Sequence, residues 1–243
     1  MKNTGLDLTS SYECPPPSVL GTHSTPDAMF GSLPLDELVA RARTLYTNAR
    51  NTDEIAALLA DPYGYTPDDY AAGLRLVAAL QQALADHARE YGEQFAATEA
   101  SEDATADLEA LFVAHRRLSR ATVDRGTARY AALGLDGRVA DAEAALFEQA
   151  GTFYQTLTDD PSLMDGIRGL DAAAVTRGQD AVEAARAAED AQVKETGEAQ
   201  QATAARDGAA RALRAHAGEL AEVAKVALAD RPQLRELLGL RER

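Results

Sequence analysis

Residues 67–125 read PDDYAAGLRLVAALQQALADHAREYGEQFAATEASEDATADLEALFVAHRRLSRATVDR, and this stretch decides the fold. Good helix formers fill most of its positions, and no proline follows the one that opens it. The acids that come directly after Thr66-Pro67 suit a helix start, because carboxylates are favoured at the positive end of a helix. Apolar residues then recur at three- and four-residue spacing, which is the pattern of one helix face. They are Leu74, Val77, Leu80, Leu84, Tyr91 and Phe95.

A polar run from Thr98 to Asp103 leaves two arrangements open for this stretch. We expect a helical hairpin with its tip near residue 100, where Ser101 would cap a new helix. The alternative is one continuous helix from 67 to about 125, which at about 1.5 Å per residue would be roughly 90 Å long. No proline separates the two halves, so the alternative stays open.

Residues 171–240 follow the order of residues 66–135 at a shift of 105 positions. The two segments share 16 identities in 70 positions without a gap. The abundance of alanine inflates this count, so the matched glycines are the stronger evidence for a repeat. They pair Gly73 with Gly178, Gly92 with Gly197, and Gly134 with Gly239. Upstream the shift is 108 and pairs Tyr46 with Tyr154. We infer a tandem duplication of a helical module of about 105 residues.

The repeat divides the chain into three parts. Residues 1–33 are an extended arm rich in proline, glycine and serine, residues 34–138 are the first helical repeat, and residues 139–243 are the second. Packing the copies together would cover the apolar stripe of each. The predicted fold is therefore all-α, with antiparallel long-helix bundles and short connecting helices. Gly92 and Gly197, at matched mid-helix positions, predict a close helix approach or a kink there.

Composition argues against several classes of partner. The net charge of −15 disfavours nucleic acid and anionic membrane surfaces. No window approaches the roughly 18 consecutive apolar residues of a membrane span. Cys14 is the only cysteine, so no disulfide framework is expected, and the first residues lack the apolar core of a signal peptide. We therefore expect a cytoplasmic protein.

Motifs that would support catalysis or bind a cofactor are missing from the sequence. There is no glycine-rich phosphate loop, no nucleophile elbow and no calcium-binding loop. The Glu-x-x-His pairs of di-metal bundles are absent at His115 and His216. Position by position, the repeat also aligns His115 with Leu220 and His216 with Leu111. We predict a non-enzymatic protein without a cofactor or a metal.

A basic run in the first copy is a candidate protein-contact face. It comprises Arg116, Arg117, Arg120, Arg125 and Arg129. The first three are the candidate contact residues, and an acidic partner surface would suit them. The alternative is a solvated helix face whose charges pair with nearby acids.

A loop with three tyrosines, Tyr63, Tyr65 and Tyr70, is a second candidate contact, because tyrosine is favoured at interfaces. Packing over the end of the bundle is the alternative for this loop.

These observations favour a non-enzymatic structural or assembly protein that self-associates or belongs to a larger complex. The alternative function is a protein-binding adaptor that uses the Arg116–Arg129 face or the Tyr63–Tyr70 loop. An enzyme or ligand carrier would need a pocket with converging polar groups, and the sequence nominates no such set. The expected partners are proteins, either further copies of the chain or other proteins.

Overall fold

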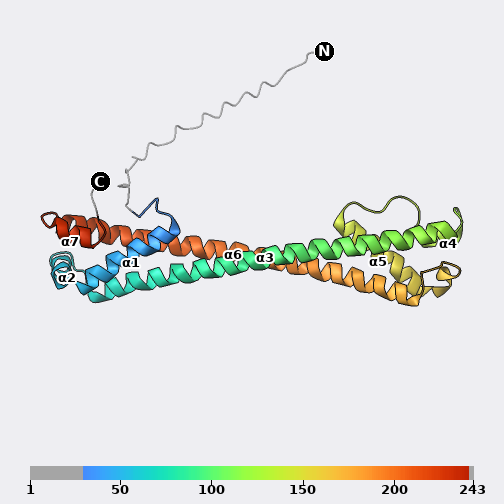
Figure 1. The fold of residues 1–243 in the computed structure, drawn as a ribbon, viewed down its shortest axis with the longest axis horizontal. Helices are drawn as coiled ribbons and strands as arrows, with labels where there is room; N and C mark the ends of the chain where they lie inside the picture. The colour runs from blue at the N-terminus through green and yellow to red at the C-terminus, as the bar shows by residue number, and fades with distance from the viewer. Residues whose placement is uncertain (1–29, 241–243) are drawn as a thin grey trace, which may run out of the picture.

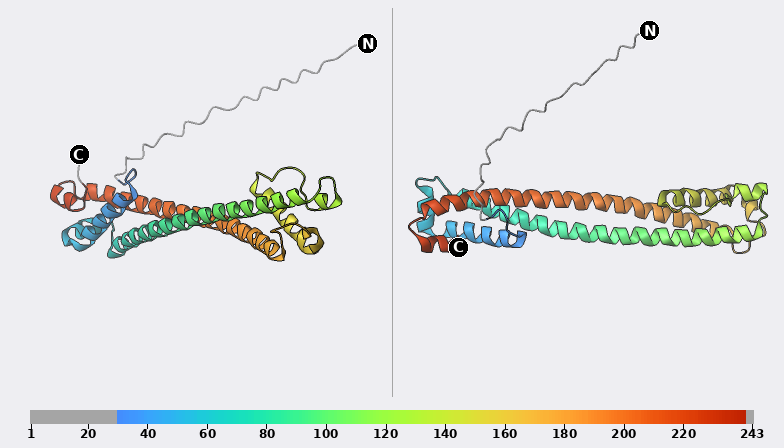
Figure 2. Two further views of the ribbon diagram at one scale, coloured as in Figure 1. Left: turned by 45° about the vertical axis from the view of Figure 1, so that its right-hand side comes forward. Right: turned by 90° about the horizontal axis from the view of Figure 1, so that it is seen from above.

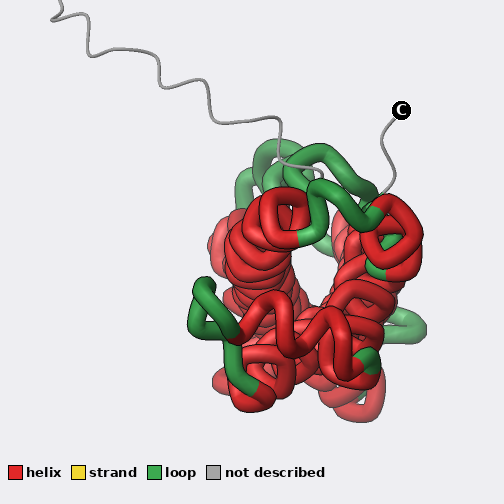
Figure 3. Tube along the Cα trace, turned by 90° about the vertical axis from the view of Figure 1, so that its left-hand side faces the viewer, coloured by secondary structure: helices red, strands yellow, loops and turns green. Residues whose placement is uncertain are grey.

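The computed structural model describes residues 30–240, and every regular element in this range is helical, as predicted. Two helices of 56 residues, α3 (Pro67–Thr122) and α6 (Ala172–Ala227), lie side by side in opposite directions and form the long axis of the molecule (Figure 1). The two views of Figure 2 show that they stay together along this axis. Seen along the axis, the described part consists of helices joined by loops (Figure 3).

The helical hairpin that we expected near residue 100 is wrong, because α3 is a single continuous helix. Its length is about 84 Å at 1.5 Å per residue. Neither proline nor glycine occurs between residues 93 and 122, so nothing in the local sequence forces a break. Ser101, the expected cap, is instead a buried mid-helix residue. A hairpin tip would have exposed this serine to water.

Local capping interactions fix where both long helices begin. The Asp69 carboxylate accepts hydrogen bonds from the backbone N–H and the hydroxyl of Thr66, both at 2.7 Å. These bonds hold the pKa of Asp69 below its ordinary value. At the start of α6 the Asp171 carboxylate accepts a bond of 2.8 Å from the Ala174 N–H. The helix start predicted at residues 66–69 is therefore confirmed.

Short helices gather at the two ends of the long pair (Figure 1). One end holds α1 (Leu35–Asn51), α2 (Asp53–Ala60) and α7 (Pro232–Leu237). The other end holds α4 (Ala128–Ala132), α5 (Glu143–Asp159) and the 3-10 helix η1 (Pro161–Met164). The division of the chain at residues 138/139 stays a prediction.

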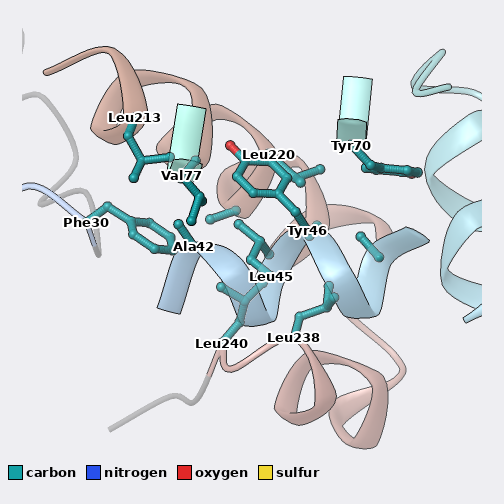
Figure 4. Close-up of a cluster of buried hydrophobic side chains, with 14 of the residues drawn as sticks. Phe30, Ala42, Leu45, Tyr46, Tyr70, Val77, Leu213, Leu220, Leu238 and Leu240 are labelled. Atoms are coloured by element: carbon teal, nitrogen blue, oxygen red, sulfur yellow. The ribbon is translucent and has the colours of Figure 1, made fainter. Parts of the chain in front are cut away.

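Each end has its own hydrophobic core, and each core draws on both halves of the chain. The first core, shown in Figure 4, joins Tyr46 of α1 and Val77 of α3 to Leu220 near the end of α6 and Leu238 after α7. The second core joins the end of α3 to α5 and the beginning of α6. Neither half of the chain can therefore close a core alone.

Between the two cores, α3 and α6 pack mostly against each other among the residues that the structure describes. Residues 85–103 of α3 and 186–208 of α6, which we call the waist, contribute nothing to either core. The waist has a polar seam, in which Gln192 approaches Thr98 and Arg206 lies 3.0 Å from His87. The molecule is thus two packed ends joined by a helix pair whose interior is mainly polar, with Ala199 as a small buried apolar residue.

The predicted N-terminal arm lies mostly outside the described residues, and so does Cys14. Its last residues belong to the first core, where Phe30 is buried and Leu33 packs against the cluster. Arg214 of α6 donates a hydrogen bond of 2.9 Å to the carbonyl of Leu33. Residues 30–33 are therefore part of the folded end.

Candidate functional site

A tyrosine, a glycine and a histidine from three helices meet in the first core. The ring of Tyr46 lies against α3 at Gly73, where an added Cβ would stand 2.2 Å from the nearest ring carbon. The Tyr46 hydroxyl lies 2.6 Å from Nδ1 of His216 on α6. Only glycine leaves room for the tyrosine ring at position 73, so the packing of Tyr46 requires a glycine there.

The second core contains the same three residue types in the same relation. A Cβ at Gly178 would stand 2.2 Å from the ring of Tyr154. The Tyr154 hydroxyl lies 3.0 Å from Nδ1 of His115 on α3. Tyr154 and Gly178 are the partners that the shifts of 108 and 105 assign to Tyr46 and Gly73.

The sequence alignment missed the correspondence of the two histidines. His115 aligns with Leu220, and His216 lies four residues before that leucine. Residues four apart share one face of a helix, so each histidine reaches its own tyrosine from a position one turn away from the other. The two histidines therefore differ in aligned position but make equivalent contacts. A search for conserved helix faces would have found the pair.

Burial is the largest cause of the pKa shifts in these clusters. Burial raises the pKa of both Tyr46 and Tyr154 above the ordinary tyrosine value. Burial, reinforced by the charge of Arg177, lowers the pKa of His115. The phenols and this imidazole are thus held neutral, and the ring of Tyr154 is closed off from solvent. Each cluster ties a short helix to a long one.

Two of the three arginines of the candidate contact face bind loop carbonyls of their own chain. Arg116 is only 2% exposed, and its guanidinium donates hydrogen bonds to the carbonyls of Gly134 (2.9 Å) and Asp136 (3.0 Å). Arg120 binds the carbonyls of Leu135 and Gly137 in the same loop. Since Arg116 is buried, it cannot meet a partner, and Arg120 is already engaged. The loop carbonyls after α4 accept hydrogen bonds from Nη2 of Arg116, whereas its Nε and Nη1 are buried without a partner among residues 30–240.

Of the three candidate arginines, only Arg117 lies exposed without such a role in the loop. Further along the run, Arg129 donates to the carbonyls of Leu163 and Asp165, which joins the α4 segment to η1. Most of the run therefore anchors loops at the second end.

The three candidate tyrosines have different surroundings. Tyr70 is buried in the first core, so it is a core residue rather than a contact. Tyr65 stacks on Tyr70, with ring centroids 6.3 Å apart. Tyr63 is 39% exposed and keeps most of the loop's accessible aromatic surface.

The two sides of the waist differ sharply in chemistry. On one side, a shallow groove of about 190 Å³ is lined by His87, Tyr91, Gln94, Ala199, Gln200 and Thr203. On the other side, carboxylate oxygens of Glu90, Glu93 and Glu195 lie within 4.8 Å of one another. Helical periodicity separates the two sets, because Tyr91 and Phe95 share one face of α3 while Glu90 and Glu93 share another. We call the first the groove side and the second the acidic side.

Gly92 and Gly197 lie in the waist without a close neighbour. A Cβ added at either glycine would meet no atom within 4 Å. The close helix approach that we expected at these positions is therefore wrong within one chain. Both helices also continue through them without a break.

Two open grooves flank α5 at the second end. One, of about 440 Å³, lies between α5 and α6 and includes Glu183 and Arg186. The other, of about 510 Å³, has an apolar floor of Phe112, Leu133 and Phe153. They share Glu148 and Thr152 at their common edge.

Comparisons with known proteins give no relative for this chain. No family model matches the sequence, and neither the curated proteins nor the solved structures include a significant match. Between residues 30 and 240, no helix combines the length and the apolar character needed to cross a membrane.

Proposed function

We propose that this protein is a non-enzymatic structural or assembly protein, an elongated spacer that holds two helical ends apart and joins other protein chains, including copies of itself. The separation of two hydrophobic cores by paired 56-residue helices carries the proposal. Such a shape places its two end surfaces far apart, which suits an element of an assembly.

The way the cores are built supports a spacer of fixed length. Each core needs helices from both halves of the chain. The two halves therefore cannot come apart unless both cores unfold. The Tyr46–His216 and Tyr154–His115 contacts fasten a short helix to a long helix at each end. Buried hydrogen bonds of this kind favour one arrangement of the packed helices.

We also propose that the fold arose from two tandem copies of one module that pack head to tail. The equal lengths of α3 and α6 support this origin. So do the two tyrosine-glycine pairs, which lie at the offsets found in the sequence. The long helix of each copy extends to the opposite end of the molecule and completes the core of the other copy there. This arrangement explains why both copies remain in one chain.

The alternative function, a protein-binding adaptor, has less support than the spacer, because few of its candidate contact residues are available to a partner. Arg116 and Tyr70 are buried, and Arg120 is bound to loop carbonyls. Arg117 and Tyr63 are the members of the two sets that remain for such a contact.

Small-angle X-ray scattering, combined with light scattering of the purified chain, tests the spacer. We expect a maximum dimension of at least about 84 Å and a complex heavier than the 25.8 kDa chain, or a co-purified protein partner. A globular particle without partners at any concentration contradicts the proposal.

A paired deletion provides a sharper test of the spacer. Residues 93–99 and 192–198 lie opposite each other in the waist, as the Thr98–Gln192 and His87–Arg206 contacts show. Removing both segments takes two turns from each helix and should shorten the particle by about 10 Å while both cores remain. An unchanged length would argue against a continuous rod.

A further inference from the structure

We propose that the groove side of the waist binds a second copy of the chain, waist against waist. This inference rests on the proposed self-association and names the surface that carries it. The partner lies along α3 and α6 between the two packed ends, so that four helices meet where a single chain has two.

Large apolar side chains that no segment within residues 30–240 covers point to this surface. Tyr91, Phe95 and Val193 are 64%, 69% and 67% exposed, and they are three of the four most exposed large apolar residues in the range 30–240. Tyr91 lines the groove together with Gln200 of the opposite helix. Phe95 follows Tyr91 by four residues and Val193 precedes Gln200 by seven, so all three belong to one side.

The clustered carboxylates of the waist disfavour its acidic side as the contact with a second copy. The chain carries a net charge of −15, so two copies repel each other wherever their acids face. The acidic side gathers Glu90, Glu93 and Glu195, and Lys194 pairs with Glu195 and Glu198 there. On the groove side, helical spacing groups five uncharged residues with the apolar trio, namely Ala88, Gly92, Thr196, Gly197 and Gln200. Two acids also belong to this side, because Glu99 follows Phe95 by four residues and Glu189 precedes Val193 by four.

The two free glycines fit a close approach by another chain. Glycine weakens a helix, and neither Gly92 nor Gly197 has a neighbour among residues 30–240 that requires it. A second backbone that lies across this side would account for both glycines, because small residues, glycine above all, let two helix backbones approach closely. Their equivalent places on α3 and α6 also suit a two-fold contact, in which the same surface serves both copies.

The polar seam provides a further reason for a second copy. A single waist buries only small apolar side chains such as Ala199, while two stacked waists would enclose the three large side chains of each chain. The waist offers about 28 Å of helix pair, roughly 20 Å wide, or about 560 Å² per copy. The combined area of about 1,100 Å² is at the lower limit for a specific interface, so the dimer is expected to be weak and reversible.

Sedimentation equilibrium of the full chain from about 1 to 300 µM tests this contact. We expect a monomer–dimer equilibrium with a dissociation constant in the micromolar range. Phe95→Glu and Val193→Glu should each weaken the dimer at least tenfold, because each places a carboxylate in the contact. Val226→Glu is the matched control, since Val226 lies on the same helix with 65% exposure but outside the waist. This control should dimerise like the parent chain.

The outcomes separate this inference from the proposed function. Loss of the dimer in both waist variants, with the control unchanged and all circular dichroism spectra alike, supports the waist contact. A dimer that survives both substitutions overturns the waist contact and leaves assembly through another surface. A parent chain that stays monomeric at 300 µM also overturns the waist contact. The proposed spacer function would then still be supported by the length of the particle and by a co-purified protein partner.

Discussion

The hydroxyl of Tyr46 lies 2.6 Å from Nδ1 of His216, and this contact joins residues 170 positions apart in the chain. Its counterpart between Tyr154 and His115 spans 39 positions. The two contacts sit in different cores, and each brings a short helix onto the long helix of the other half. Equivalent tyrosine–histidine contacts therefore join a short helix to a long helix at both ends of the molecule, although their sequence separations differ widely.

Replacing four glycines with alanine should divide them into two pairs of opposite effect. Gly73→Ala and Gly178→Ala should each lower the free energy of unfolding by about 2 kcal/mol, because the new Cβ overlaps a buried tyrosine ring. Gly92→Ala and Gly197→Ala should each raise it by up to about 1 kcal/mol, since alanine favours the helix and meets nothing. Urea unfolding at low protein concentration measures all four.

Equal effects at all four positions would contradict the packing described for the two tyrosines. Combining Gly73→Ala with Tyr46→Leu provides the control, because removing the ring should recover part of the loss.

Acid should destabilise the protein partly through His115. Burial and Arg177 hold the pKa of this imidazole below its ordinary value of 6.5, so the unfolded chain binds a proton more readily than the folded one. The contribution is full above about pH 6.5 and is lost as the pH falls toward the lowered pKa. Unfolding at about pH 7.5 and 5.5 should show a smaller pH-dependent loss for His115→Gln than for the parent chain. An identical loss in both would exclude His115 as a source.

Truncation of Arg116 should destabilise the second end. Arg116→Ala removes two hydrogen bonds to the loop after α4 and the packing of the guanidinium over Phe112, so we expect a loss of about 2–4 kcal/mol. Arg117→Ala, one residue away and exposed, should change the free energy of unfolding by less than about 0.5 kcal/mol. Thermal unfolding compares the two. Comparable losses would mean that the loop is not anchored as described.

Hydrogen exchange should be faster in the waist than at the ends. Residues 85–103 and 186–208 belong to neither core, and local opening there exposes little apolar surface. Amides of α1 and α5, which pack in the cores, should be protected for longer. Mass-spectrometric exchange of the dilute monomer measures this difference, and a waist as protected as α5 would show that its polar seam is more stable than its composition implies.

The sequence by itself determined the helical class, the start of α3 and the offsets that pair Tyr46 with Tyr154 and Gly73 with Gly178. These features are local or periodic, because helix propensity, capping and spacing along one face are written in neighbouring residues. The sequence also showed that Gly92 and Gly197 are equivalent, but not what surrounds them.

Only the tertiary structure decided that α3 runs unbroken past Ser101, that Arg116 is buried and that His115 and His216 play the same part. Each of these depends on which distant segment covers a helix face, and a polar residue becomes buried once a second helix lies over it. Local preferences cannot report that neighbour, because it comes from the other half of the chain.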